Sequence, residues 1–313
     1  MILRCSVFLL VFFISAAAQA TKPAEKTPSV NTDPLTVVAT IRPVHSLLSS
    51  ITQGVTTPVL LLDQTASVHH YSLLPSQRST LNHADLIFWI GAALEGFLPR
   101  VLNSLPRQVK VIELIEAKNI RSLQPRGSVD EHAGHAHGHH NENIDPHLWL
   151  SIDNAMAMAQ SMTTALSKAD PANKAIYQTN LKKLIKRLQQ TKNKTLQEFK
   201  NANFNYLVYH DAYQYFENMI KVKPLSAISN DEENAPGIRH LTQVNQLISK
   251  HKINCLIYNS YKLPAIVNNL IDQNITKIQI DPLAQNLKPG PELYFNLLDS
   301  ISSGYQQCRQ VSK

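Results

Sequence analysis

Short, continuously apolar segments that alternate with helical patterns constrain the fold of this chain more than any other feature of its sequence. The first half carries such segments at 35–39, 58–62, 85–90 and 109–114. The second half repeats the pattern with FNYLVYH (204–210), NCLIYN (254–259) and KIQID (277–281). Strands that are apolar on both faces belong to parallel sheets that helices cover on both sides. The sequence therefore predicts an α/β protein of two lobes, each built on a parallel sheet flanked by helices.

One long helical pattern separates the two halves. Asp170 and Pro171 form an N-cap followed by a proline at the first helical position, which is typical of a helix start. Apolar residues then recur with a helical period over about thirty residues, roughly 45 Å at 1.5 Å per residue. The pattern lacks a sustained coiled-coil repeat, so we interpret it as a rod between the lobes. The expected division is an N-terminal lobe over 35–169, a linking helix over 170–201 and a C-terminal lobe over 202–313.

The N-terminus has the features of an export signal. Arg4 precedes an apolar core at 7–14, and Ala18-Gln19-Ala20 has the small–x–small pattern that signal peptidase cuts after. Cleavage after Ala20 leaves a polar leader over 21–34, and an uncleaved anchor is the alternative. No later segment approaches the roughly 20 apolar residues of a membrane helix. We therefore expect a soluble, exported protein.

Two cysteines remain after removal of the signal peptide, Cys255 and Cys308. An even number of cysteines in an oxidising compartment favours a disulfide between them. Two unrelated buried thiols are the alternative, because the sequence does not show whether the two residues are close.

The charge balance does not indicate a nucleic-acid partner. The chain has 30 Lys and Arg against 23 Asp and Glu, a net charge of +7. A nucleic-acid binder concentrates such an excess in a stripe interleaved with aromatic residues. Here the lysines are spread along the linking helix and at the chain ends, as on a solvated face.

Histidine is unusually frequent, with 13 residues. Five of them crowd into the tract DEHAGHAHGHHNEN over 130–143, at His132, His135, His137, His139 and His140. Because the tract has nothing apolar to bury, it predicts a mobile loop. Its histidine density suits weak, exchangeable capture of a cation such as Zn²⁺. An accidental polar loop is the alternative.

A second group of candidate ligands stands where predicted elements end and loops begin. Its members are His69, His147, His210 and Asp281, two from each half. In open parallel sheets, ligands bind beyond the carboxyl ends of the strands. Each residue alone fits a surface position, but four metal-capable groups at such places predict a metal site. Their spacing is too long for a local zinc motif.

Four segments resemble a known family in sequence and in order: ASVHHYSLLPS, DPHLWLS, VYHDAYQYFE and QIDPLAQN. The family is that of the periplasmic zinc-binding proteins of bacterial ABC importers, the cluster A-I or cluster 9 solute-binding proteins. A His-rich, acidic loop ahead of the DPH motif is a further mark of its zinc-importing members. The resemblance covers nearly all of 35–313. It implies a periplasmic location, two lobes joined by a backbone helix, Zn²⁺ held in the cleft between them, and delivery to a membrane permease with its cytoplasmic ATPase.

The resemblance also implies a ligand set. The family's three imidazole ligands and its carboxylate position correspond here to His69, His147, His210 and Asp281. Zinc importers often have Glu-His-Asp where this chain has Val68-His69-His70, so both acidic flanks are missing. The fourth ligand is then Asp281 or a water, with His70 as a further alternative. Manganese-binding relatives carry Glu at the position of His210, so an imidazole there favours Zn²⁺. Cys255 and Cys308 match the disulfide of the zinc-binding members.

Two other functions compete with zinc import. Three histidines and an open position would suit a secreted zinc hydrolase, in which the metal activates a water. The chain has no His-Glu-x-x-His helix and no obvious general base, so we expect a binding protein and not an enzyme. A stand-alone zinc buffer or chaperone is the other alternative. We expect a monomer with no nucleic-acid partner.

Overall fold

The computed structural model describes residues 34–63, 68, 71–126, 144–229, 236–259, 263–271 and 274–312. The expected signal peptide, nearly all of the leader, the His-rich tract and the pair His69 and His70 lie outside these described residues. What the sequence predicts for them stays a prediction. Among the helices that are described, none combines the length and apolar character that crossing a membrane requires.

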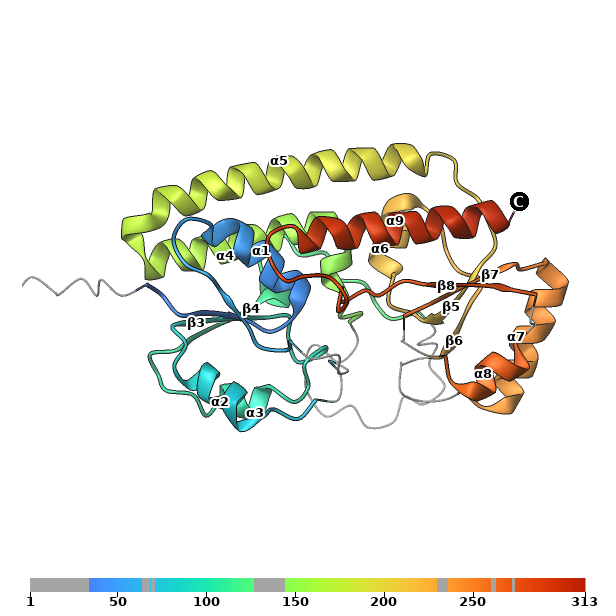
Figure 1. Cartoon of the computed structure of the whole chain (residues 1–313), viewed down its shortest axis with the longest axis horizontal. Helices are drawn as coiled ribbons and strands as arrows, with labels where there is room; N and C mark the ends of the chain where they lie inside the picture. Colours follow the sequence, from blue (N-terminus) through green and yellow to red (C-terminus); the bar gives the residue numbers. More distant parts are fainter. Residues whose placement is uncertain are drawn as a thin grey trace, which may run out of the picture. The chain divides into compact units, whose positions relative to one another are not determined.

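The first half contains a four-stranded parallel sheet (Figure 1). Its strands, in the order β2-β1-β3-β4, are β1 (Val37–Ala39), β2 (Val59–Leu60), β3 (Leu86–Trp89) and β4 (Lys110–Glu113). Val38 of β1 lies beside Val59 on one side and Ile87 on the other. Strands β1 and β3 are buried along their whole length, as their unbroken apolar sequences predict. Each of the four apolar segments expected in this half contains one strand.

Helices and short 3-10 turns accompany this sheet. They are α1 (Arg42–Thr52), α2 (Pro75–Asn82), α3 (Pro99–Leu102), η1 (Leu114–Glu116), η2 (Leu148–Leu150) and α4 (Ile152–Ala169). A proline stands in the first turn of α1, α2 and α3, where its missing N–H has no helical partner to lose. Between β3 and β4 the chain forms only the four-residue helix α3, which begins at Pro99.

The second half contains another parallel sheet, with the strand order β6-β5-β7-β8. Its elements are β5 (Leu207–His210), α6 (Gln214–Ile220), β6 (Ser226–Ser229), α7 (Ile238–His251), β7 (Cys255–Tyr258), α8 (Ala265–Leu270), β8 (Thr276–Gln279) and α9 (Leu293–Val311). A small separate core packs α7 and α8 on this sheet, with Val244 and Val267 buried in it. Three of the four strands coincide with the predicted apolar segments. The two parallel sheets confirm the predicted fold class.

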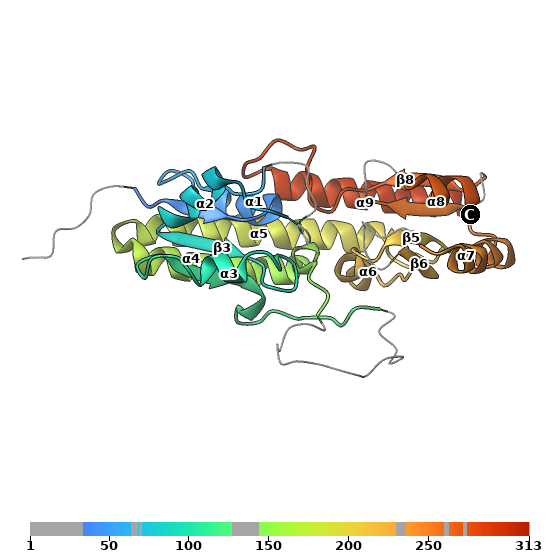
Figure 2. The same cartoon turned by 90° about the horizontal axis from the view of Figure 1, so that it is seen from below.

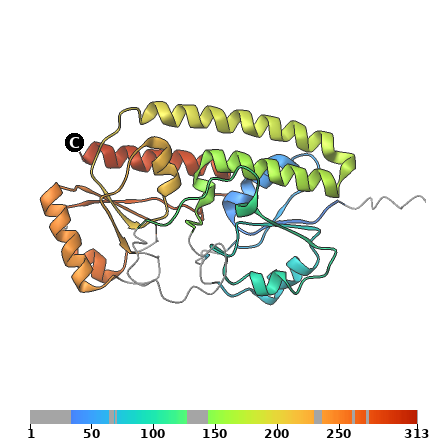
Figure 3. The same ribbon diagram turned by 180° about the vertical axis from the view of Figure 1, so that it is seen from behind.

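The long helix expected between the halves is present. It begins with the 3-10 turn η3 (Pro171–Asn173) and continues as α5 (Lys174–Glu198). The side chain of Asp170 caps it by accepting a hydrogen bond from the N–H of Asn173 at 3.3 Å. Helix α5 packs on α1 and α4 of the first half and on α6 of the second, and in Figures 1 and 3 it runs from the first sheet toward the second.

The C-terminal helix α9 runs beside α5 (Figure 2). The hydroxyl of Ser302 in α9 donates to Glu198 of α5 at 2.8 Å. Arg187 of α5 forms two hydrogen bonds of 2.6 Å to Glu292, the residue that precedes α9. Helix α9 also packs on β7, β8 and α1. Two long helices therefore connect the halves.

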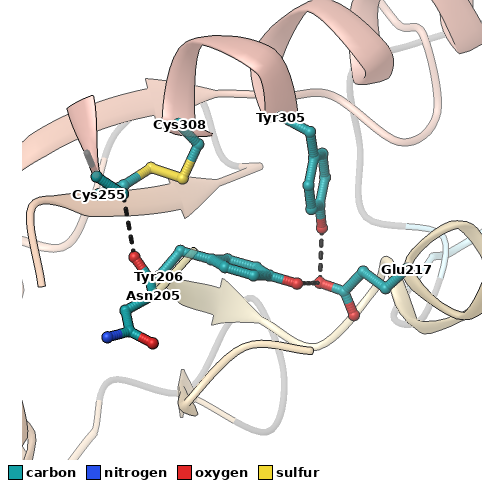
Figure 4. The surroundings of a disulfide bond; sticks show 7 residues. Asn205, Tyr206, Glu217, Cys255, Tyr305 and Cys308 are labelled. Carbon is teal, nitrogen blue, oxygen red and sulfur yellow. Dashed lines mark hydrogen bonds between the residues drawn. A yellow bond between two sulfur atoms is a disulfide. The ribbon is translucent and has the colours of Figure 1, made fainter. Parts of the chain in front are cut away.

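A disulfide joins Cys255, the first residue of β7, to Cys308 in α9 (Figure 4). The sulfur atoms are 2.01 Å apart and the Cα atoms 5.5 Å apart, and both residues are buried. The disulfide prediction is therefore confirmed, and the alternative of two unrelated thiols is wrong. The bond holds the end of the C-terminal helix against the second sheet.

Candidate metal centre

His210 is the last residue of β5, which lies between β6 and β7 in the second sheet. Every residue of this strand is buried, because the apolar sequence LVY is covered on both faces. His210 itself is only 5% exposed, and its backbone lies beside Ser229 at the end of β6. The histidine therefore occupies the edge of the sheet where open parallel sheets bind their ligands.

His147 belongs to the loop that leads into η2 and α4, and Asp145 fixes its orientation. One oxygen of Asp145 accepts hydrogen bonds from the backbone N–H of His147 at 3.0 Å and from its Nδ1 at 2.8 Å. Both residues are buried, with 2% and 5% of their surfaces exposed. With Nδ1 as the donor, Nε2 carries the lone pair of the neutral imidazole. A carboxylate on the other ring nitrogen is a common partner of a metal-binding histidine.

The imidazole rings of His147 and His210 lie next to each other although they come from different halves. Their centroids are 5.3 Å apart, and the ring planes meet at 66°. The buried indole of Trp149 lies 5.4 Å from the His147 ring and donates to the carbonyl of Pro282 at 2.8 Å. The two histidines therefore share an environment with little access to water, and imidazole is a ligand type that suits borderline cations such as Zn²⁺.

Asp281 lies in a tight turn after β8. One of its carboxylate oxygens accepts from the N–H of Leu283 at 2.9 Å, and the other accepts from the N–H of Gln285 at 2.5 Å. Burial raises the pKa of this carboxyl, and the backbone N–H donors of the turn oppose that rise. The carbonyl of the preceding residue, Ile280, accepts from the hydroxyl of Tyr213. The Asp281 turn is thus tied to the segment that follows β5.

The candidate ligands are only partly brought together by the described residues. Within the described ranges, no three His, Cys, Asp or Glu side chains lie close enough together to hold a metal ion. His147 and His210 are neighbours, and Asp281 does not join them in such a group. His69 lies outside the described residues, while Val68, directly before it, is buried in the main core. The five tract histidines also lie outside them: His132, His135, His137, His139 and His140.

A largely buried ion-pair network begins at Asp211, the residue after β5. The guanidinium of Arg126 donates to both oxygens of Asp211 and, at 2.5 Å, to Glu217. The hydroxyls of Tyr206 and Tyr305 donate to the other oxygen of Glu217 at 2.8 and 2.6 Å (Figure 4). Burial raises the pKa of the fully buried Glu217, and Arg126 is the main group that opposes the rise. The network ties the first-half segment before the His-rich tract to β5 and α6.

Reasoning from the sequence missed Asp145, which orients His147, and Arg126, which binds the residue after His210. Asp145 stands two positions before His147 in the segment NIDPHLWLS, so a carboxylate next to a candidate ligand was the available signal. Arg126 left no local signal, because its partners Asp211 and Glu217 are 85 and 91 residues away.

Comparison with known proteins identifies close relatives of the whole folded chain. A family model described as "Zinc-uptake complex component A periplasmic" (ZnuA) matches residues 37–308. A high-affinity zinc uptake system protein ZnuA of Brucella abortus (strain 2308) is 32% identical over 304 residues, covering 87% of this chain and 91% of that protein. The ZnuA of Yersinia pestis is 30% identical over 290 residues, with 87% and 90% covered.

Solved structures share the fold. A crystal structure of ZnuA has a TM-score of 0.74 at 19% identity, covering 90% of this chain and 100% of that one. The AdcAII protein of Streptococcus pneumoniae has a TM-score of 0.72 at 19% identity, with 90% and 99% covered. The arrangement of two parallel sheets and a long helix is therefore shared with these proteins.

Proposed function

We propose that this chain, which belongs to the ZnuA family of periplasmic zinc-uptake proteins, captures Zn²⁺ outside the cytoplasm and delivers it to an ABC-type permease. The permease would work with a cytoplasmic ATPase, and the exported protein would act as a monomer after cleavage behind Ala20. A family named for zinc uptake favours a binding protein over the secreted zinc hydrolase considered from the sequence.

The observation that carries this proposal is the pairing of His147 with His210. Two buried imidazoles from different halves lie with centroids 5.3 Å apart, and a carboxylate orients one of them. Imidazole nitrogens bind zinc at about 2.0–2.1 Å, and four-coordination is usual. A zinc ion bound by both rings would join the two halves and stabilise the folded protein in proportion to its affinity.

We propose His69, His147 and His210 as the protein ligands. Asp281 is a weaker candidate for the fourth position, since both of its oxygens already accept backbone hydrogen bonds within its own turn. That arrangement favours a water as the fourth ligand. Neutral imidazoles suit Zn²⁺ better than Mn²⁺, which prefers oxygen ligands.

Zinc titration of alanine variants tests the ligand set. The mature protein should bind one Zn²⁺ tightly, and His69→Ala, His147→Ala and His210→Ala should each abolish tight binding. His83→Ala is the matched control, because His83 is exposed at the end of α2 and its ring forms a hydrogen bond of 2.8 Å with the carbonyl of Ser79 in its own helix. If the three ligand variants retain tight binding, the assignment is wrong.

A genetic experiment separates an importer from a stand-alone zinc buffer. In zinc-limited medium, the protein should support growth only in cells that have a zinc permease. Support of growth that persists after deletion of the permease genes would indicate a buffer.

We propose that the His-rich tract adds weak sites and raises the local zinc concentration near His147. Its histidines are set among small and acidic residues, and ordering each residue costs about 1–2 kcal/mol of backbone entropy. Deletion of residues 132–140 should therefore remove weak binding and leave one tight site. Loss of the tight site would place tract histidines among the primary ligands.

A further inference from the structure

The hydroxyl group of Tyr215 links two first-half segments to a second-half helix. It accepts a hydrogen bond from the backbone N–H of Leu123 at 3.0 Å and donates one to the carbonyl of Asp145 at 2.8 Å. The N–H of Asp145 also donates to the carbonyl of Leu123 at 2.8 Å, so the two segments are paired with each other. Tyr215 belongs to α6 and is only 4% exposed. The buried side chain of Tyr215 in α6 therefore forms hydrogen bonds with both first-half segments, the one at Leu123 and the one at Asp145.

The bond to Asp145 has a consequence for the candidate metal centre, because Asp145 orients His147. The Tyr215 hydroxyl holds the main chain of Asp145, and the Asp145 carboxylate holds both the main chain and the ring of His147. Tyr215 stands five positions after His210, in the helix that follows β5. A short series of hydrogen bonds thus connects the segment that carries one histidine to the segment that carries the other.

Other buried tyrosines hold neighbouring loops in a related way. The hydroxyl of Tyr213 donates to the carbonyl of Ile280, and that of Tyr294 donates to the carbonyl of Trp149. The Tyr215 hydroxyl contacts both a donor and an acceptor of the main chain, the N–H of Leu123 and the carbonyl of Asp145. Removal of the hydroxyl would therefore disturb two main-chain groups at once, one buried and one partly buried, and the segments would shift to recover hydrogen bonds.

We propose that Tyr215 is a positioning residue for zinc capture. Its hydroxyl holds the Asp145–His147 turn at the separation from His210 that a shared zinc ion requires. This inference rests on the zinc-binding function proposed above. Groups that support metal ligands from outside the coordination sphere typically contribute about 10–100-fold to metal affinity, and we expect an effect of that size for one hydroxyl.

The test compares Tyr215→Phe with Tyr177→Phe. Tyr177 is a matched control, because it is also buried and its hydroxyl donates to Asp170 at 2.8 Å, where α4 meets η3. Zinc affinity is measured by competition with a chelator, and the absorption spectrum of the Co²⁺-loaded protein reports the coordination geometry. Tyr215→Phe should bind zinc at least about tenfold more weakly and show an altered Co²⁺ spectrum. Tyr177→Phe should match the unmodified protein in both measurements.

Three results bear on the inference. Unchanged affinity and an unchanged Co²⁺ spectrum in Tyr215→Phe would overturn it. Equal losses of affinity in both variants would also overturn it, because the hydroxyl would then act only through general stability. Failure of the unmodified protein to bind one zinc ion tightly would instead refute the proposed function, and the same titration shows it.

Discussion

Replacement of Arg126 by methionine should show how much the ion-pair network beside β5 contributes to the free energy of unfolding. Methionine keeps the length of the side chain and removes its charge and donors. The fully buried carboxylate of Glu217 would lose a partner 2.5 Å away, and Asp211 would lose both of its guanidinium hydrogen bonds. Breaking a buried pair from one side costs about 3–5 kcal/mol, because the remaining charge is left without compensation.

The loss should depend on pH in a direction that follows from the pKa of Glu217. Burial already raises this pKa with Arg126 present, and removal of the cation raises it further. In the unfolded chain the carboxyl titrates near its ordinary pKa of about 4.3. Because the Glu217 carboxyl binds its proton more tightly in the folded variant, protonation stabilises the fold, and this stabilisation is complete below the pKa of the unfolded chain. It is lost as the pH rises toward the higher pKa of the folded variant. The slope is about 1.4 kcal/mol per pH unit in that window.

Urea unfolding of the metal-free protein, followed by circular dichroism at about pH 5 and about pH 7.5, measures both effects. The loss in Arg126→Met should be clearly larger at the higher pH. Arg187→Met is the control, because the pair of Arg187 with Glu292 is exposed, with 45% and 62% of the side chains accessible. Such a pair contributes about 1 kcal/mol or less. Equal losses in the two variants, or a loss in Arg126→Met that does not grow with pH, would refute the reasoning.

Three further changes have defined outcomes. Asp145→Ala should weaken zinc binding about 10–100-fold, since the neighbouring imidazole loses the carboxylate that orients it; Asp85→Ala, an exposed carboxylate before β3, should leave the chelator competition unchanged. Replacement of Cys255 and Cys308 by serine should lower the free energy of unfolding by up to about 4 kcal/mol, the chain-entropy value for a 53-residue separation, and a thermal melt identical to that of the oxidised protein would show that the bond adds nothing. His210→Glu should move the Zn²⁺/Mn²⁺ affinity ratio toward Mn²⁺ while zinc still binds more tightly, and a constant ratio in competition titration would remove His210 from the ligand set.

The strands could be predicted where burial on both faces requires an unbroken apolar sequence. The segment LIFW of β3 is the clearest case, because all four residues are buried. Strand β6 could not be predicted in this way. Its sequence SAIS is half polar, and two of its four residues are only partly buried at the edge of the sheet. An edge strand needs less apolar surface, so its sequence carries less of the signal.

The candidate site could be predicted only in part. The positions of the candidate ligands follow from local sequence patterns, whereas the residues that contact the ligand segments are brought there by packing between distant parts of the chain. His147 and His210 occupy ends of elements that the apolar pattern defines, so their places follow from the fold. Arg126 depends on packing between segments about ninety residues apart, which no local pattern encodes. His69 and the tract histidines lie outside the described residues, so their roles stay predictions.

The position of Trp149 gives this protein an optical reporter of its own metal content. Its indole ring lies 5.4 Å from the ring of His147 and is held in place by the carbonyl of Pro282. Tryptophan emission responds to charges that arrive within a few ångströms, so a divalent cation on His147 should change the fluorescence without an added dye. The chain has two tryptophans, and Trp89→Phe would leave Trp149 as the single tryptophan, whose emission can be excited selectively beyond the tyrosine absorption. Rapid mixing of that variant with zinc would then resolve the rates at which the ion arrives and departs.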